Sequence, residues 1–200
     1  MSTTVASDPR TPQEWHEVTA PPRALAAAAG VLVGRLGLGT LAPDALRGLV
    51  EELAARTDLW QPLVITDALR RRYRLLYEDP RLDVWILSWM PGQKTGFHDH
   101  GNSSVALTGV QGVVLEQQIC LGTANIAREL GPGRTQQAPA GYIHSVAHAS
   151  GEPAVTLHAY SPPLIDVGQY RNGALAELVR ERQHGRQELL DKAPLPDPFI

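Results

Sequence analysis

The pattern of hydrophobic and polar positions changes near residue 60. Before that point, residues 43–56 (PDALRGLVEELAAR) carry leucines and a valine at helical spacing, behind a proline that suits a first turn. Residues 22–38 are alanine-rich and also helical in pattern, although three glycines weaken the helical propensity. We expect these two segments to form helices that cover one face of a sheet.

After Trp60 the pattern is that of β-strands. RRYRLLYED and then RLDVWILSWMPG are both extended in pattern, and the second is apolar along its whole length, as in a strand that is buried on both faces. Short β-type runs follow, separated by turn residues at a spacing of about eight to twelve residues. This regular spacing predicts a mainly β fold, either a sandwich or a small barrel.

These patterns divide the chain into four parts within a single domain. We expect a flexible N-terminal arm over residues 1–22 and a helical segment that packs on the barrel over 23–60. The barrel itself is expected over 61–172, and a C-terminal extension over 173–200.

Charge and composition exclude several classes of partner. The formal net charge is −3, so nothing in the overall charge suggests a basic face that binds nucleic acid. A single cysteine, Cys120, excludes an intramolecular disulfide and is compatible with a reducing compartment. The apolar run over residues 24–34 is too short to span a bilayer and lacks a basic leader. We expect a cytoplasmic monomer that binds neither nucleic acid nor membrane.

The histidines carry the clearest chemical signal. His98 and His100 lie one residue apart in GQKTGFHDH, so on a strand both imidazoles share one face, while Asp99 points to the other. His144 in PAGYIHSV and His158 in TLHAY fall on separate predicted strands. Inward-facing histidines from several strands of a small barrel would form a metal site.

The spacing around these histidines resembles the two paired motifs of the cupin family. In the first, Gly92 is followed by five residues, then by HDH, and Gly112 closes the motif. In the second, Gly133 is followed by five residues, then by PAG, two further residues and His144. The resemblance implies a small cupin barrel, a double-stranded β-helix of jelly-roll type, with N-terminal helices in front.

Two positions depart from the cupin pattern. Val105 stands where the first motif usually has a glutamate, and His148 stands where the second often ends in asparagine. Without the glutamate, three neutral imidazoles leave a divalent ion with its full charge and with open coordination positions. Such a site favours an anionic ligand such as a thiolate.

Three stretches are similar to the thiol dioxygenases, most closely to bacterial cysteine dioxygenase. They are WMPGQKTGFHDHGNS, HSVAH and LHAYSPP, and the similarity runs from about Arg72 to Leu164. The resemblance implies one Fe(II) per chain, bound by His98, His100 and His144. It also implies that O2 oxidises a small thiol, with L-cysteine expected, to its sulfinic acid.

The resemblance further implies catalytic roles for His158 and Tyr160. Thr156, His158 and Tyr160 alternate along one strand face and match the family's Ser-His-Tyr relay, in which the histidine orients the tyrosine hydroxyl near substrate and oxygen. In mammalian members this tyrosine is cross-linked to a cysteine that aligns with Val105, so the cross-link cannot form here.

The carboxylate-binding residue is less clearly placed. In the family, an arginine in a Tyr-x-Arg strand holds the substrate carboxylate, and enzymes that prefer 3-mercaptopropionate have glutamine there. Here the strand reads RRRYRLL, and alignment on the tyrosine puts Leu75 at the arginine position. Arg72 and Arg74 share one strand face. We assign Arg74 to substrate binding, with Arg72 as the alternative.

Other functions stay open. A 3-mercaptopropionate dioxygenase would use the same site, and a different metallo-cupin could hold Mn, Ni or Zn, because three imidazoles do not select iron. A non-enzymatic sensor cupin is a further alternative, although the N-terminal helices show no basic DNA-recognition face. The thiol dioxygenase leads because it explains the three histidines, the missing glutamate and LHAYSPP together.

Overall fold

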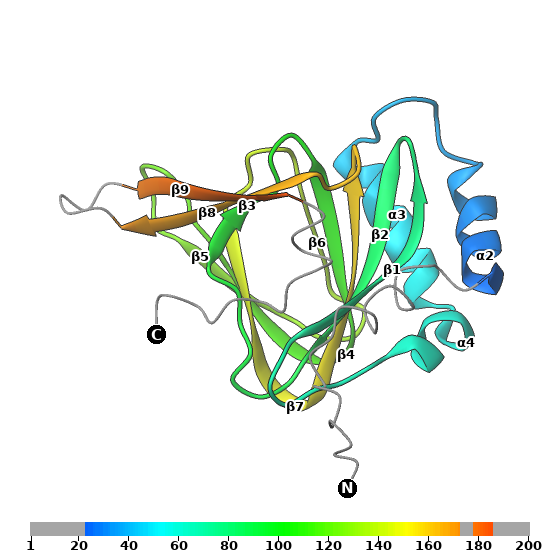
Figure 1. Ribbon diagram of the computed structural model, residues 1–200, viewed down its shortest axis with the longest axis horizontal. Helices are drawn as coiled ribbons and strands as arrows, with labels where there is room; N and C mark the ends of the chain where they lie inside the picture. Colours follow the sequence, from blue (N-terminus) through cyan, green and yellow to red (C-terminus); the bar gives the residue numbers. More distant parts are fainter. Residues whose placement is uncertain (1–22, 173–177, 186–200) are drawn as a thin grey trace, which may run out of the picture.

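The computed structural model describes residues 23–172 and 178–185, which form a barrel of strands with helices on one side (Figure 1). The helices are α2 (Arg23–Val33), α3 (Pro43–Ala54), α4 (Thr57–Trp60) and the short η1 (Gln61–Leu63). The strands are β1 (Arg72–Asp79), β2 (Leu82–Trp89), β3 (Phe97–Asp99), β4 (Ser104–Gln118), β5 (Ile126–Leu130), β6 (Thr135–Ala138), β7 (His144–Ser161), β8 (Asp166–Asn172) and β9 (Leu178–Gly185). The expected N-terminal arm lies outside the described residues.

All nine of these strands belong to one antiparallel sheet that folds over into the two halves of a barrel. The order β1-β2-β7-β3-β8-β9 forms one path, and β4 pairs with β5, β6 and β7. The long strands β4 and β7 run alongside each other over most of their length and bend, so each takes part in both halves of the barrel. This is the mainly β barrel with N-terminal helices that the sequence predicted.

Gly112 shows why the bend in β4 requires glycine. Its φ is +56°, a conformation that L side chains rarely adopt. A Cβ at this position would also lie 2.6 Å from the carbonyl oxygen of Glu152 in β7. Because the clash is with backbone, no side-chain rearrangement relieves it, and the glycine that closes the first motif is needed for the two long strands to approach.

The inside of the barrel is apolar apart from the candidate site. Its buried cluster combines strands from both halves and includes Trp85, Trp89, Val105, Leu107, Val114, Val146 and Tyr160. These residues lie on alternate positions of their strands, which is the period-2 pattern of one sheet face.

Helices α2, α3 and α4 pack against the outer face of β1, β2, β4 and β7 (Figure 1). α3 buries Leu46, Leu49, Val50 and Leu53, the residues that the helical spacing marks as its apolar face. Each such side chain contributes about 1.5–3 kcal/mol when fully buried. The two predicted helices are therefore confirmed, and their role is to complete a second hydrophobic layer outside the barrel.

Hydrogen bonds tie this helical segment to the barrel. Ser161 Oγ accepts from the Leu41 backbone N–H at 2.8 Å and donates to the Arg81 carbonyl at 2.6 Å. The Arg81 guanidinium in turn donates to the Gly37 carbonyl at 3.0 Å. The connection between α2 and α3 is thus fixed at the edge of the sheet.

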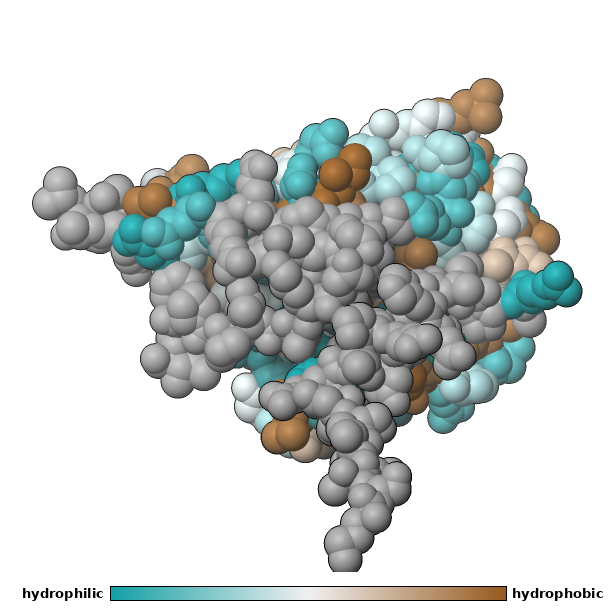
Figure 2. All heavy atoms as spheres, viewed as in Figure 1, coloured by the Kyte–Doolittle hydropathy of each residue, from teal (hydrophilic) through white to brown (hydrophobic). Residues whose placement is uncertain are grey.

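The opposite end of the barrel carries the β8–β9 hairpin, and β8 also pairs with β3 (Figure 1). β9 continues the sheet beyond residue 172, where the sequence-based division ended the barrel. On the face seen in Figure 2, hydrophobic side chains of the described residues stand singly among hydrophilic ones. Within the described ranges, no helix is long and apolar enough to cross a membrane.

Candidate metal centre

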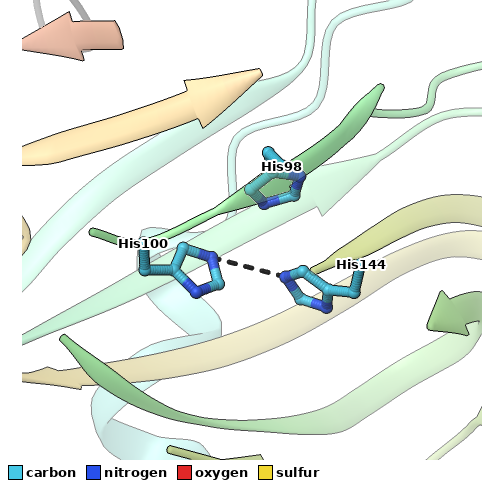
Figure 3. A group of neighbouring side chains, drawn as sticks. All are labelled: His98, His100 and His144. Atoms are coloured by element: carbon cyan, nitrogen blue, oxygen red, sulfur yellow. Dashed lines mark hydrogen bonds between the residues drawn. The ribbon is translucent and has the colours of Figure 1, made fainter. Parts of the chain in front are cut away.

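His98, His100 and His144 point toward one another inside the barrel (Figure 3). His98 lies in β3, His100 follows that strand directly, and His144 begins β7 as the antiparallel partner of His98. One nitrogen from each ring lies within 4.8 Å of the others. The structure therefore brings together the three ligands that the sequence predicted.

The hydrogen bonds of these rings leave nitrogen lone pairs facing the shared space. His98 Nδ1 donates to the Gly96 carbonyl at 3.0 Å, and His144 Nδ1 donates to Glu116 Oε1 at 2.8 Å. With those tautomers, both Nε2 atoms are acceptors. His144 Nε2 lies 3.3 Å from His100 Nε2, close to the spacing of about 3.0–3.4 Å expected for two nitrogens each about 2.1 Å from one ion. The donor set fits a divalent metal ion.

Burial keeps the rings of His98 and His100 neutral. The pKa of His98 falls to about 3, chiefly because burial disfavours the charged form and secondarily because of His144. The pKa of His100 lies well below its ordinary value for the same two reasons. At neutral pH these rings are therefore ready to ligate without first losing a proton.

Asp99 points to the other face of β3, as the strand pattern predicted. Its carboxylate accepts from Tyr170 Oη at 2.6 Å and from Arg180 Nε at 2.7 Å. Burial alone would raise its pKa, but the hydrogen bonds from Arg180 and Tyr170 outweigh burial and lower it. Asp99 thus fixes the β8–β9 hairpin to the strand that carries the histidines.

A chain of hydrogen bonds runs along β7 next to the metal site. Trp89 Nε1 donates to Thr156 Oγ1 at 2.9 Å, Thr156 lies 2.9 Å from His158 Nε2, and His158 Nδ1 lies 3.0 Å from Tyr160 Oη. The Tyr160 ring centroid is 4.9 Å from that of His100. The three residues expected on one strand face are thus connected and adjacent to the histidines.

The direction of this chain follows from its first member. An indole N–H can only donate, so Thr156 Oγ1 accepts from Trp89 and is free to donate its own proton to His158 Nε2. Burial holds the pKa of His158 well below its ordinary value, so the ring is neutral and carries its proton on Nδ1. His158 then donates to Tyr160 Oη, which leaves the Tyr160 proton for an acceptor at the metal site.

The structure does not bring Arg74 or Arg72 to the histidines, and the assignment of Arg74 as the pocket-facing arginine is corrected here. Arg74 pairs across the sheet with Ile86, whose side chain belongs to the layer under the helices. Arg72 shares that outer face and forms an ion pair with Asp67. Both arginines therefore point away from the barrel interior.

Arg71, one position earlier, faces the site instead. Its guanidinium lies 4.8 Å from the centre of the Trp89 ring, and its charge acts on His98, His158 and Tyr160. Its Nε is buried without a hydrogen-bond partner, and no carboxylate of the described residues pairs with it. A buried cation without a counter-ion is costly unless an anion joins it.

Val105 stands at the position of the glutamate that is missing from the first motif. It is fully buried inside the barrel, where it pairs across the sheet with Tyr160. No carboxylate or thiol stands at this position, so the three histidines have no acidic partner from the first motif.

Sequence reasoning did not single out three residues that belong to this site: Arg71, Trp89 and Glu116. Arg71 belongs to a run of arginines whose side chains point to both faces of the sheet, so the sequence did not distinguish it from its neighbours. Glu116 could have been flagged, because an acid two residues after the buried Val114 shares its inward face.

Comparisons with known proteins agree with this site. Residues 18–173 match the family model of cysteine dioxygenase type I. Similar solved structures include a protein of Thermus thermophilus, with 24% identity over 52% of this chain and 93% of that chain and a TM-score of 0.45. A double-stranded β-helix protein of Klebsiella pneumoniae shares 19% identity over 58% of this chain and 84% of that chain, with a TM-score of 0.44.

A cupin superfamily protein of Desulfitobacterium hafniense shares 15% identity over 51% of this chain and 85% of that chain, with a TM-score of 0.42. Similarity at this level carries no information on the reaction. The family model spans most of the chain, including the three histidines and the Thr156–Tyr160 strand. The chain has the cupin fold and belongs to the cysteine dioxygenase type I family.

Proposed function

We propose that this enzyme is an Fe(II)-dependent thiol dioxygenase whose substrate is a small thiol that also carries a carboxylate, with L-cysteine as the first candidate. The reaction adds both atoms of O2 to the thiol sulfur and yields the sulfinic acid, a step of cysteine catabolism. The observation that carries the proposal is the meeting of three histidines with Tyr160 and with Arg71, whose guanidinium pairs with no carboxylate of the described residues.

His98, His100 and His144 would hold the iron through Nε2. Bound there, Fe(II) would supply electrons for O2 activation and positive charge that favours the thiolate form of the substrate. Because the apolar Val105 stands where a fourth protein ligand would be, there is room on the ion for O2 and for the substrate thiolate.

Arg71 is the residue that we propose for the substrate carboxylate. Guanidinium binds carboxylates through two parallel hydrogen bonds, and Trp89 stacked against one side restricts its orientation. A divalent ion and Arg71 bring three positive charges, and a thiolate with a carboxylate brings two negative ones. Binding of such a dianion would relieve the uncompensated charge on Arg71.

Tyr160 would donate a hydrogen bond from its hydroxyl to bound O2 or to the sulfur of the bound thiolate. Burial raises the pKa of Tyr160, so the hydroxyl stays protonated at neutral pH. His158 donates to this hydroxyl and so fixes its position. Thr156 in turn donates to His158, and Trp89 donates to Thr156. We further propose that the chain works as a cytoplasmic monomer, since its one cysteine needs no oxidising compartment.

The test is O2 uptake by Fe(II)-loaded protein, with cysteine and 3-mercaptopropionate offered separately and the products identified by mass. We expect sulfinate from a carboxylate-bearing thiol and little turnover of cysteamine, which has no carboxylate. Arg71→Met should raise KM by at least about tenfold, in line with the loss of a charge-assisted hydrogen bond.

Arg74→Met is the matched control, because it removes the same charge from the outer face of the adjoining strand β1, and it should leave KM unchanged. Faster turnover of 3-mercaptopropionate than of cysteine would keep the reaction and change the substrate. The absence of uptake with every small thiol, despite bound iron, would exclude the dioxygenase.

A further inference from the structure

Glu116 in β4 lies behind the metal site and is fully buried. Its Oε1 accepts from His144 Nδ1 at 2.8 Å and from Tyr142 Oη at 3.0 Å, and its Oε2 accepts from Arg128 at 2.9 Å. Three donors therefore satisfy one carboxylate. A carboxyl that receives three such bonds is held in its ionised form by geometry.

The sheet register explains why Glu116 reaches His144. Glu116 stands opposite Arg128 in β5 and Val146 in β7, and Gln118, two residues on, stands opposite His144. Glu116 and His144 thus lie on adjacent strands at neighbouring inward positions. Arg128 also donates to Tyr142 Oη at 2.9 Å and to Gln118 Oε1 at 3.0 Å, whereas the bond from Glu116 to His144 is made by the other carboxylate oxygen.

The charge of Glu116 has a direct bearing on the metal. His98, His100 and His144 bring no negative charge, and Val105 removes the acidic ligand of the usual cupin motif. Glu116 is the carboxylate that contacts a ligand ring through a hydrogen bond, on the side away from the metal. A carboxylate in this place fixes the tautomer and orientation of a histidine ligand and raises its basicity.

We propose that Glu116 is a positioning residue. Through the ring of His144, it supplies the negative charge that the missing cupin glutamate would supply by direct contact with the metal. It increases the affinity of the three-histidine site for a divalent ion while it leaves the coordination position beside Val105 open. This inference rests on the metal site of the proposed function but not on its substrate or its reaction.

Arg128 offers a way to separate this role from a structural one. Its side chain is 25% exposed whereas that of Glu116 is 0% exposed, so Arg128 can be solvated alone and Glu116 cannot. Replacing either Arg128 or Glu116 removes the ion pair between them. Only loss of Glu116, however, removes negative charge from the metal site.

The experiment compares Glu116→Gln with Arg128→Met and measures Co(II) and anaerobic Fe(II) affinity by competition with a chromophoric chelator, without any thiol present. Glu116→Gln should weaken binding about 10–100-fold, the range found for outer-sphere partners of histidine ligands. Arg128→Met keeps the bond between Glu116 and His144, so it should leave affinity unchanged or tighter. The Co(II) absorption spectrum should change only in Glu116→Gln.

Equal losses of affinity in both variants, or parent-like affinity in Glu116→Gln, would overturn the proposal. If Glu116→Gln does not fold, Arg128→Met decides alone, because a loss there of more than about threefold would show that the ion pair acts through general stability. Since no thiol is present, a failure here is distinct from a failure to oxidise thiols.

Discussion

Replacing Thr156 with valine should destabilise the protein far more than its loss of one hydroxyl suggests. Thr156 is fully buried between two partners, accepting from Trp89 Nε1 and contacting His158 Nε2, each at 2.9 Å. Valine has nearly the same shape, so no cavity forms, but both partners lose their hydrogen bond in the barrel interior. Each unsatisfied buried group costs about 1–3 kcal/mol, which gives about 2–6 kcal/mol for the pair.

At about 2–4 °C per kcal/mol for a domain of this size, the melting temperature should fall by at least about 4 °C. Thermal unfolding followed by circular dichroism measures this fall, and Thr156→Ser, which keeps the hydroxyl, is the matched control. Nitrogen-15 NMR of the imidazoles should show that His158 loses its single tautomer in the valine variant alone. A valine variant that melts within about 2 °C of the serine variant, with the His158 tautomer unchanged, would refute the directed hydrogen-bond chain.

Three further predictions concern other parts of the site. Tyr160→Phe should lower kcat for thiol oxidation by at least about tenfold at unchanged metal content, because the hydroxyl held by His158 is lost; equal O2 uptake by both proteins would contradict this. Metal-free protein should lose stability as pH falls from about 6.5 toward 3, because the pKa of His98 is about 3 when folded and the unfolded chain takes up the proton first; melting temperatures that stay flat from about pH 7.5 to about pH 4 would disprove it. Gly168→Ala should destabilise the β8–β9 hairpin because a Cβ would displace the Arg180 guanidinium from Asp99; urea unfolding should show that its effect and that of Arg180→Ala are not additive, and full additivity would argue against the clamp.

Strand geometry predicted that His98 and His100 share one face, and the resemblance to the cupin motifs added His144, which the structure places beside them. Two residues that are two positions apart on a strand always share a face, whatever the rest of the fold does. The same rule placed Asp99 on the far side and Thr156, His158 and Tyr160 together. The helices were predictable for a related reason, since the leucines of α3 repeat at the helical period.

The inward direction of Arg71 was not predictable, because the run RRRYR puts guanidinium groups on both faces of the sheet. Which face is inward depends on the partner strand, where Leu87 opposes Tyr73 and Ile86 opposes Arg74. An irregularity between Leu75 and Tyr77 also shifts the register, so counting back from β2 gives the wrong parity. The inward direction of Glu116 was predictable, but its hydrogen bond to His144 was not. That bond depends on the pairing of β4 with β7, and the two residues are 28 positions apart in the sequence.

The alternation in His98-Asp99-His100 means that one strand supplies the metal site with one face and is anchored to the β8–β9 hairpin with the other. A slip of β3 by a single residue would turn both imidazoles outward and carry the carboxylate inward. Correct ligand geometry therefore requires the correct pairing of β3, and an ion bound by the histidines would favour the native register.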